Sequence, residues 1–231
     1  KITQVTRHEL VILRNGNREQ SVPIVQVRSV AYSKEPVQLD RARTFVSQQQ
    51  YADAAEILET LDAAKIERVE VRQDVEFYRA LCEARIALRG RGSVTDAGSA
   101  MFKFTSAHKQ SYHYLAACEV LGELLVRSGK YAQAMKYFQT LAEAPWPQTK
   151  IRAAILMSRC LRQQKQWDQA LSRLDGVFAL APQDEEAKLR FELAKLEKAL
   201  CWVETDQADQ AIELIQKVIG DADPQQIELH A

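Results

Sequence analysis

Residues 121–138 of this chain read LGELLVRSGKYAQAMKYF. Tyr131 closes a short turn in this segment, and Ala134 follows it three residues later. The same arrangement occurs five times along the chain, and the steps between successive alanines are 43, 37, 36 and 41 residues. The turn residues are Tyr51, Val94, Tyr131, Trp167 and Ala208, and the alanines are Ala54, Ala97, Ala134, Ala170 and Ala211. A repeat with this period predicts stacked supersecondary units.

Each repeat is predicted to form two helices joined by a tight turn. Three further columns, six residues before, seven after and ten after the turn residue, are apolar in all five copies. A column nine residues before it is small in four copies, and Arg85 is the exception. Gly92 and Gly129 suit the left-handed conformation that ends a helix. Pro182 and Pro224 fall where the second helices of repeats four and five should stop.

This pattern resembles the tetratricopeptide repeat family over about residues 35–224. The best copies are repeat three, with Leu121-Gly122, Leu125, Gly129, Tyr131, Ala134 and Phe138, and repeat four, with Leu161, Trp167, Ala170, Leu174 and Pro182. The resemblance implies a mainly α fold, a right-handed solenoid of antiparallel helix pairs whose first helices line a concave groove. It implies a protein or peptide partner and no catalysis. Repeats longer than the family's usual length of about 34 residues imply extended helices or loops.

The resemblance also places candidate partner-binding residues in the groove. They are Arg79, Glu119, Glu123, Arg152, Arg159 and Arg162. The glutamates of repeat three and the arginines of repeat four would put opposite charges on adjacent helices. Either these charges pair with each other, or the arginines bind carboxylates of a partner through bidentate hydrogen bonds. The family's carboxylate clamp needs Lys and Asn at two of the groove positions, and this chain departs from it, so binding of an acidic chaperone C-terminus is not expected.

Repeat five carries an unusual amount of apolar surface. Leu189, Leu193, Leu196, Leu200 and Val203 recur at steps of 4, 3, 4 and 3 residues. A helix that is apolar nearly all round is normally buried, whereas the last repeat of an array needs a polar outer face. Either residues 225–231 begin a covering helix or tail, or another chain covers this face. Self-association through Leu193, Leu196 and Leu200 would make the protein a homo-oligomeric assembly subunit.

Residues 1–33 differ in kind from the repeats and predict a three- or four-stranded β-meander. Its segments are a possible first strand at Ile2–Val5, then Leu10–Leu13, the hairpin signal Asn15-Gly16, Ser21–Val25 and a third apolar stretch at Val27–Tyr32. So small a sheet needs a covering partner. It is either an N-terminal cap for the repeats at 34–224 or a separate partner-binding module.

Composition and motifs predict no cofactor, no metal site and no enzyme activity. Lys plus Arg equals Asp plus Glu at 31 each, so a general attraction to nucleic acid is not expected. No apolar run is long enough for a transmembrane helix, so membrane insertion is not expected either. Four cysteines follow the repeat, one in each first helix from repeat two onward, without a CxxC pair. Buried thiols are expected there rather than zinc ligands or disulfides.

One local basic cluster surrounds the turn at residues 89–92, Arg-Gly-Arg-Gly. It is either a solvated turn or a contact for phosphate or acidic groups, which would suit an accessory protein. The sequence starts at Lys1 within a predicted strand, so we expect an upstream segment such as a signal sequence. The bacterial cell envelope or periplasm and the cytoplasm both stay open as compartments.

Overall fold

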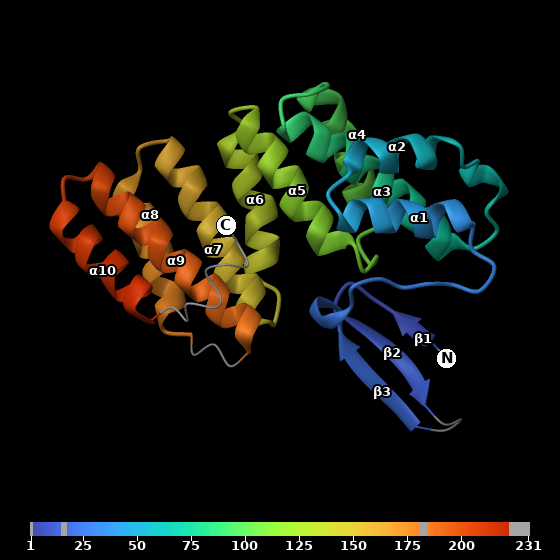
Figure 1. The fold of residues 1–231 in the computed structure, drawn as a ribbon, viewed down its shortest axis with the longest axis horizontal. Helices are drawn as coiled ribbons and strands as arrows, with labels where there is room; N and C mark the ends of the chain where they lie inside the picture. Colours follow the sequence, from blue (N-terminus) through green and yellow to red (C-terminus); the bar gives the residue numbers. More distant parts are fainter. Residues whose placement is uncertain (1, 15–17, 181–183, 222–231) are drawn as a thin grey trace. The chain divides into compact units, whose positions relative to one another are not determined.

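The computed structural model describes residues 2–14, 18–180 and 184–221. The described residues form two compact units, one up to residue 137 and one from residue 138 onward. The described residues are mainly helical, with a small N-terminal sheet (Figure 1). The helices are α1 (Val37–Ser47), α2 (Tyr51–Glu59), α3 (Val69–Leu88), α4 (Val94–Ala107), α5 (Tyr114–Arg127), α6 (Tyr131–Ala142), α7 (Pro147–Gln163), α8 (Trp167–Phe178), α9 (Glu185–Glu204) and α10 (Ala208–Asp221). Asn15-Gly16, Pro182, Pro224 and the segment 225–231 lie outside the described residues, so the expectations placed on them stay predictions.

The predicted repeat register is confirmed by the helix boundaries. Each of the five turn residues is the first residue of a second helix, α2, α4, α6, α8 or α10. All five alanines of the repeated column are at most 2% exposed. A larger side chain at any of these positions would therefore separate the two helices of a pair. The extra length of the repeats appears as long first helices, since α3 and α9 each have 20 residues.

Each first helix is followed, two residues after its last residue, by a residue in the left-handed conformation. These residues are Gln49, Gly90, Gly129, Lys165 and Asp206. At Gly129 the next amide, of Lys130, donates to the carbonyl of Leu125 at 2.8 Å, which closes a Schellman cap. In repeat two, Gly90 rather than Gly92 forms this cap, because the Arg91 amide donates to Ile86, while Gly92 also has a positive φ of 85°.

The caps predict that replacing glycine with alanine destabilises the protein at a helix cap and stabilises it inside a helix. Gly129→Ala should lower the free energy of unfolding by about 1–2 kcal/mol, since a Cβ is disfavoured at positive φ, although it would meet no atom within 4 Å. Lys165→Gly should raise it by up to about 1 kcal/mol for the same reason. Gly176→Ala, within α8, is the matched control and should stabilise by about 1 kcal/mol. Thermal melts of the three variants test this, and equal signs for Gly129→Ala and Gly176→Ala would contradict it.

The N-terminal sheet has three antiparallel strands in the order β1 (Ile2–Val5), β2 (Glu9–Arg14), β3 (Arg18–Pro23). In the β2–β3 pair, Glu9 lies opposite Pro23 and Arg14 opposite Arg18. A fourth strand at Val27–Tyr32 is wrong. This segment follows a short 3-10 helix at Ile24–Gln26 and forms no ladder, because it packs its own apolar side chains against the helices instead.

The segment between sheet and helices is part of the core of the first unit. Val30 and Tyr32 are 2% and 7% exposed and join one apolar cluster with Leu10 of β2 and Leu39 of α1. The guanidinium of Arg7, beside the sheet, lies 5.9 Å from the centre of the Tyr114 ring in α5. The N-terminal region therefore contacts α5, the first helix of repeat three, as well as α1, the first helix of repeat one.

Candidate interaction surfaces

Arginine–carboxylate pairs join the first helices of neighbouring repeats within each unit. The pairs are Arg43 of α1 with Asp74 of α3 at 2.5 Å, Arg85 of α3 with Glu123 of α5 at 2.6 Å, and Arg159 and Arg162 of α7 with Glu197 of α9 at 2.9 and 2.6 Å. Asp74 and Glu197 are almost fully buried. Arg85, the exception in the column of small residues, therefore has a structural partner in the next repeat.

The predicted groove residues are mostly engaged within the fold. Arg79 donates to the carbonyls of Leu58 and Leu61 at the end of α2, at 2.5–3.2 Å. Glu119 and Arg152 are half-buried on α5 and α7. Within the second unit, Arg159 and Arg162 of α7 pair with Glu197 of α9, and pairing of the repeat-three glutamates with the arginines of repeat four stays a prediction. Sequence reasoning missed Glu197, whose one visible signal was a carboxylate inside the apolar pattern of α9.

A buried polar network surrounds Asp74, which sequence reasoning also missed. The Tyr112 hydroxyl donates to both Asp74 oxygens at 2.9 and 3.0 Å, and His113 Nε2 lies 3.1 Å from Oδ1. Arg43 links Asp74 to Glu35, whose carboxylate accepts from the Tyr32 amide. Burial lowers the pKa of His113, although its hydrogen bond to Asp74 opposes the shift. Burial and the Asp74 charge raise the pKa of Tyr112, so its hydroxyl keeps its proton and donates to Asp74. Arg43 is the cation that the carboxylates of Asp74 and Glu35 share.

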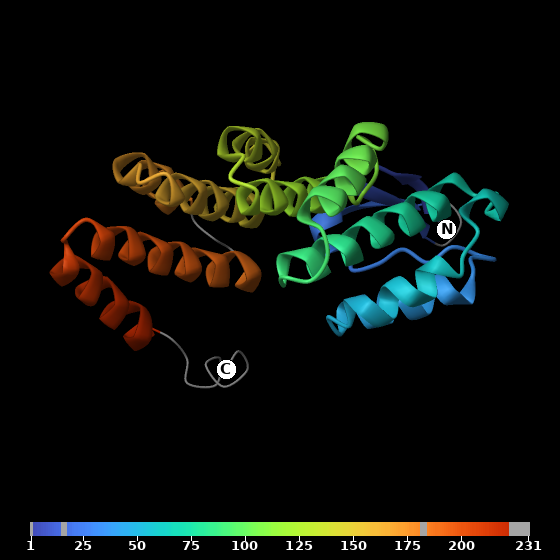
Figure 2. The same cartoon turned by 90° about the horizontal axis from the view of Figure 1, so that it is seen from above.

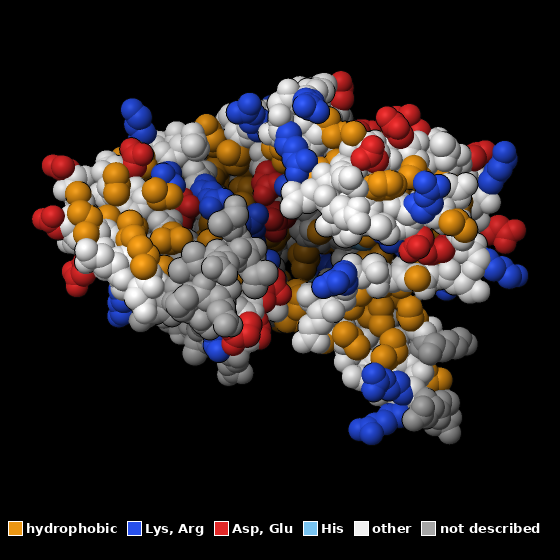
Figure 3. Space-filling view, viewed as in Figure 1, with side chains coloured by type: hydrophobic (Ala, Val, Ile, Leu, Met, Phe, Trp, Pro, Cys, Tyr) orange, Lys and Arg blue, Asp and Glu red, His pale blue; other side chains and the backbone are white. Residues whose placement is uncertain are grey.

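The face of repeat five that carries apolar residues at heptad spacing is exposed to solvent. It consists of Leu189, Leu193, Leu196, Leu200 and Val203 on α9 with Ile212 and Ile219 on α10, each 37–62% exposed. We call these seven residues the repeat-five face. The two helices run side by side (Figure 2), and apolar side chains gather over them in Figure 3. Seven of the ten exposed large hydrophobic side chains in the described residues belong to this face.

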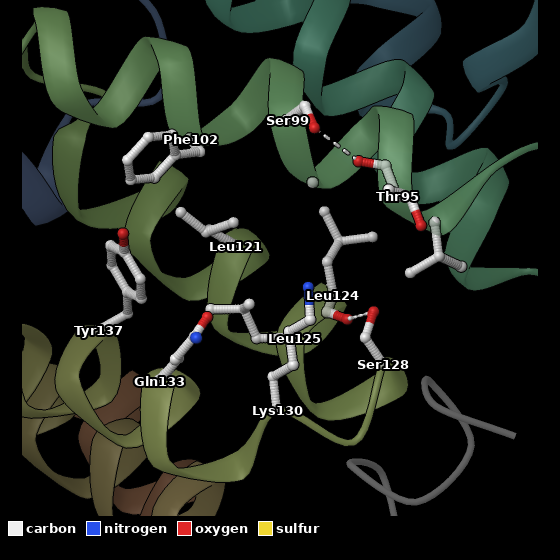
Figure 4. Close-up of a pocket in the computed structure, with 12 residues that line it drawn as sticks. Thr95, Ser99, Phe102, Leu121, Leu124, Leu125, Ser128, Lys130, Gln133 and Tyr137 are labelled. Atoms are coloured by element: carbon white, nitrogen blue, oxygen red, sulfur yellow. Dashed lines mark hydrogen bonds between the residues drawn. The ribbon is translucent and has the colours of Figure 1, made fainter.

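A pocket of about 490 Å³ lies between α4, α5 and α6, within the first unit (Figure 4). Leu121, Leu124 and Leu125 of α5 form one wall, and Phe102 of α4 and Tyr137 of α6 face it. The remaining lining residues are Val94, Thr95, Gly98, Ser99, Ser128, Lys130 and Gln133. The repeated positions gave no indication of this pocket, because it arises where repeat two departs from the other repeats.

Residues 125–190 match the tetratricopeptide repeat family. Solved structures that resemble the chain include the nearly identical TPR-like repeats of a Podosopora anserina protein named as a kinesin light chain, with 20% identity, 80% of this chain and 92% of that chain covered, and a TM-score of 0.61. MamA of AMB-1 shares 16% identity with 84% and 96% covered and a TM-score of 0.54.

The structure of YrrB, described as a TPR protein with an unusual peptide-binding site, shares 16% identity, covers 85% of this chain and 91% of its own, and has a TM-score of 0.51. No curated protein sequence matches the chain. The likeness to these structures establishes a tetratricopeptide-like fold for the repeats.

The cysteines of the tetratricopeptide-like repeats are free and buried. Burial raises the pKa of Cys82 to about 12 and that of Cys118 to about 11, which keeps both thiols protonated near neutral pH. In the part of the chain that the structure describes, no three His, Cys, Asp or Glu side chains gather as metal ligands. Within the same residues, no helix has the length and apolarity to span a membrane.

The basic turn at residues 89–92 is partly used by the fold. Arg89 donates to the Gln49 side chain at 2.8 Å and lies 4.8 Å from the centre of the Tyr51 ring. One of its two arginines therefore joins repeat two to repeat one.

Proposed function

We propose that this chain is a non-catalytic scaffold that binds a partner protein through the repeat-five face. The observation that carries the proposal is the exposure of a strict heptad of large apolar side chains on α9. Contiguous apolar patches of this kind mark interaction sites in soluble proteins. Support also comes from the fold, because a protein with similar repeats, YrrB, is described as having a peptide-binding site.

The proposed occupant is a helix with an apolar stripe of its own. At the positions that match Leu196, Leu200 and Val203, repeat four has Ile155, Arg159 and Arg162. Ile155 is only 1% exposed, and both arginines bind α9. The repeat-five face is thus the continuation of a surface that receives the next first helix in repeat four. Because its arginines are replaced by leucine and valine, the occupant needs apolar side chains there rather than a carboxylate.

A synthetic amphipathic helix tests this proposal. The probe carries leucines at heptad positions, and its control peptide has the same composition in scrambled order. We expect only the heptad peptide to bind, and we expect the triple variant Leu193→Ser, Leu196→Ser, Leu200→Ser to lose this binding. The matched variant Asp53→Ser, Glu56→Ser, Glu59→Ser on the exposed side of α2 should keep it. Equal binding of the two peptides, or binding to the triple variant, would refute the proposal.

A second copy of the chain is the other candidate occupant. Any second copy presents a stripe with identical spacing, and its net charge of zero adds no general repulsion. Contact through the same face on both copies would close as a twofold dimer. Sedimentation velocity over a range of concentrations should then show a dimer that Leu196→Glu dissociates. A monomer at every concentration would leave the helix of another protein as the occupant.

The charged residues of the first helices are less suited to bind a partner than the repeat-five face. Arg79, Arg159 and Arg162 already donate to groups of the fold, and Glu123 accepts from Arg85. A partner that bound these groups would first have to break contacts between repeats. We therefore assign their main role to the spacing of the repeats, and we do not extend the proposal to phosphate binding at the basic turn.

A further inference from the structure

Repeat two departs from the other repeats at two positions of α4 that line the pocket between α4, α5 and α6. Four residues after the turn residue, the other repeats carry Ala55, Met135, Leu171 and Ile212, whereas repeat two has Gly98. A Cβ at Gly98 would meet no atom within 4 Å, so the missing side chain leaves open space. Gly98 therefore lines the α4 side of the pocket without filling it.

The second departure is Phe102, one helical turn further along the same face. Eight residues after the turn residue, the other repeats have exposed polar side chains, Glu59, Gln139, Asp175 and Gln216. Phe102 is also exposed, by 55%, and it points toward Leu121 and Tyr137 across the pocket (Figure 4). An exposed aromatic ring next to an absent side chain forms a slot for one bulky apolar group.

The charge at the pocket favours an acidic ligand. Lys130 is the only Lys, Arg, Asp or Glu among the lining residues. Val94 and Thr95 belong to the first turn of α4, and Lys130 and Gln133 lie at the start of α6. Helix N-termini carry partial positive charge. Asp96 in the first turn offsets that of α4, whereas α6 has no acidic residue in its first turn, so the start of α6 and the Lys130 ammonium group are the positive groups at the slot.

We propose that this pocket binds an acidic segment of a partner protein that inserts one bulky apolar side chain between Phe102 and the leucines of α5. A carboxylate next to that side chain would face Lys130 and the start of α6. The pocket volume of about 490 Å³ lies within the range of ligand sites in proteins. This site is separate from the repeat-five face and does not depend on it.

The decisive variant is Gly98→Leu, which fills the pocket with the residue that repeat four has at the matching position, Leu171. Because nothing lies within 4 Å of the added Cβ, the helix should keep or gain stability, as a thermal melt will show. A random peptide library is selected on the natural protein with the Gly98→Leu variant as counter-target. This step removes peptides that bind elsewhere, including on the repeat-five face.

We expect the selected peptides to combine a bulky apolar residue with neighbouring Asp or Glu. Their affinity, measured by calorimetric titration, should fall about 10- to 100-fold in Gly98→Leu, as loss of one buried apolar side chain implies. Phe102→Gln and Lys130→Glu should also weaken binding, while Gly176→Leu, the same change in α8, should not. The proposal is overturned if no peptide distinguishes the natural protein from Gly98→Leu, or if the selected peptides are basic.

Discussion

Replacing Arg43 with methionine should lower the free energy of unfolding by about 3–5 kcal/mol, because it leaves a buried carboxylate without its cation. Asp74 is 0% exposed and Arg43 is 8% exposed. The arginine also binds Glu35 at 2.5 Å, so its loss frees the segment that joins the sheet to α1. Chemical denaturation followed by circular dichroism measures the change.

The matched control is Arg190→Met, which breaks an exposed pair with Glu186 one turn away on α9. Such a pair contributes about 0–1 kcal/mol, so this variant should unfold almost like the parent. The double variant Arg43→Met, Asp74→Leu should be more stable than the sum of its single changes predicts, since the fully buried Asp74 charge is gone and only Glu35 still lacks its cation. Similar losses for Arg43→Met and Arg190→Met would show that the buried network contributes little.

Removing residues 1–33 should destabilise the first unit by about 3–6 kcal/mol and promote aggregation. The deletion takes away Val30 and Tyr32, and burial of each such side chain is worth about 1.5–3 kcal/mol. It also uncovers Leu39, which is 0% exposed in the intact chain. Light scattering and a denaturant titration measure both effects.

A shorter deletion separates the role of the sheet from that of the following segment. Removing residues 1–23 takes away the strands but keeps Ile24, Val30 and Tyr32, so we expect a smaller loss of stability. Equal losses for both deletions would place the stabilising contacts in the sheet itself. A long deletion that stays monomeric and melts like the parent would show that the N-terminal region is an independent appendage.

The repeat register was predictable because it rests on short-range chemistry. Two helices that pack closely need a small residue at the contact, so the alanine column fixed where each second helix begins, and Tyr51, Val94, Tyr131, Trp167 and Ala208 all begin one. The open heptad on α9 was predictable for a similar reason, since its spacing lies within one helix. By contrast, the apolar run at Val27–Tyr32 gave no sign that it would pack on helices instead of pairing as a strand.

The sequence alone thus determined the class of fold, the phase of its repeats and the unpartnered leucines, because these follow from periodicity along neighbouring turns. Only the tertiary structure decided which charges meet. Arg43 and Asp74 are 31 residues apart, and Arg159 and Glu197 are 38 apart, so each pair exists only once two first helices pack together. The slot beside Gly98 likewise depends on three helices at once, because the size of a pocket depends on all the side chains that surround it.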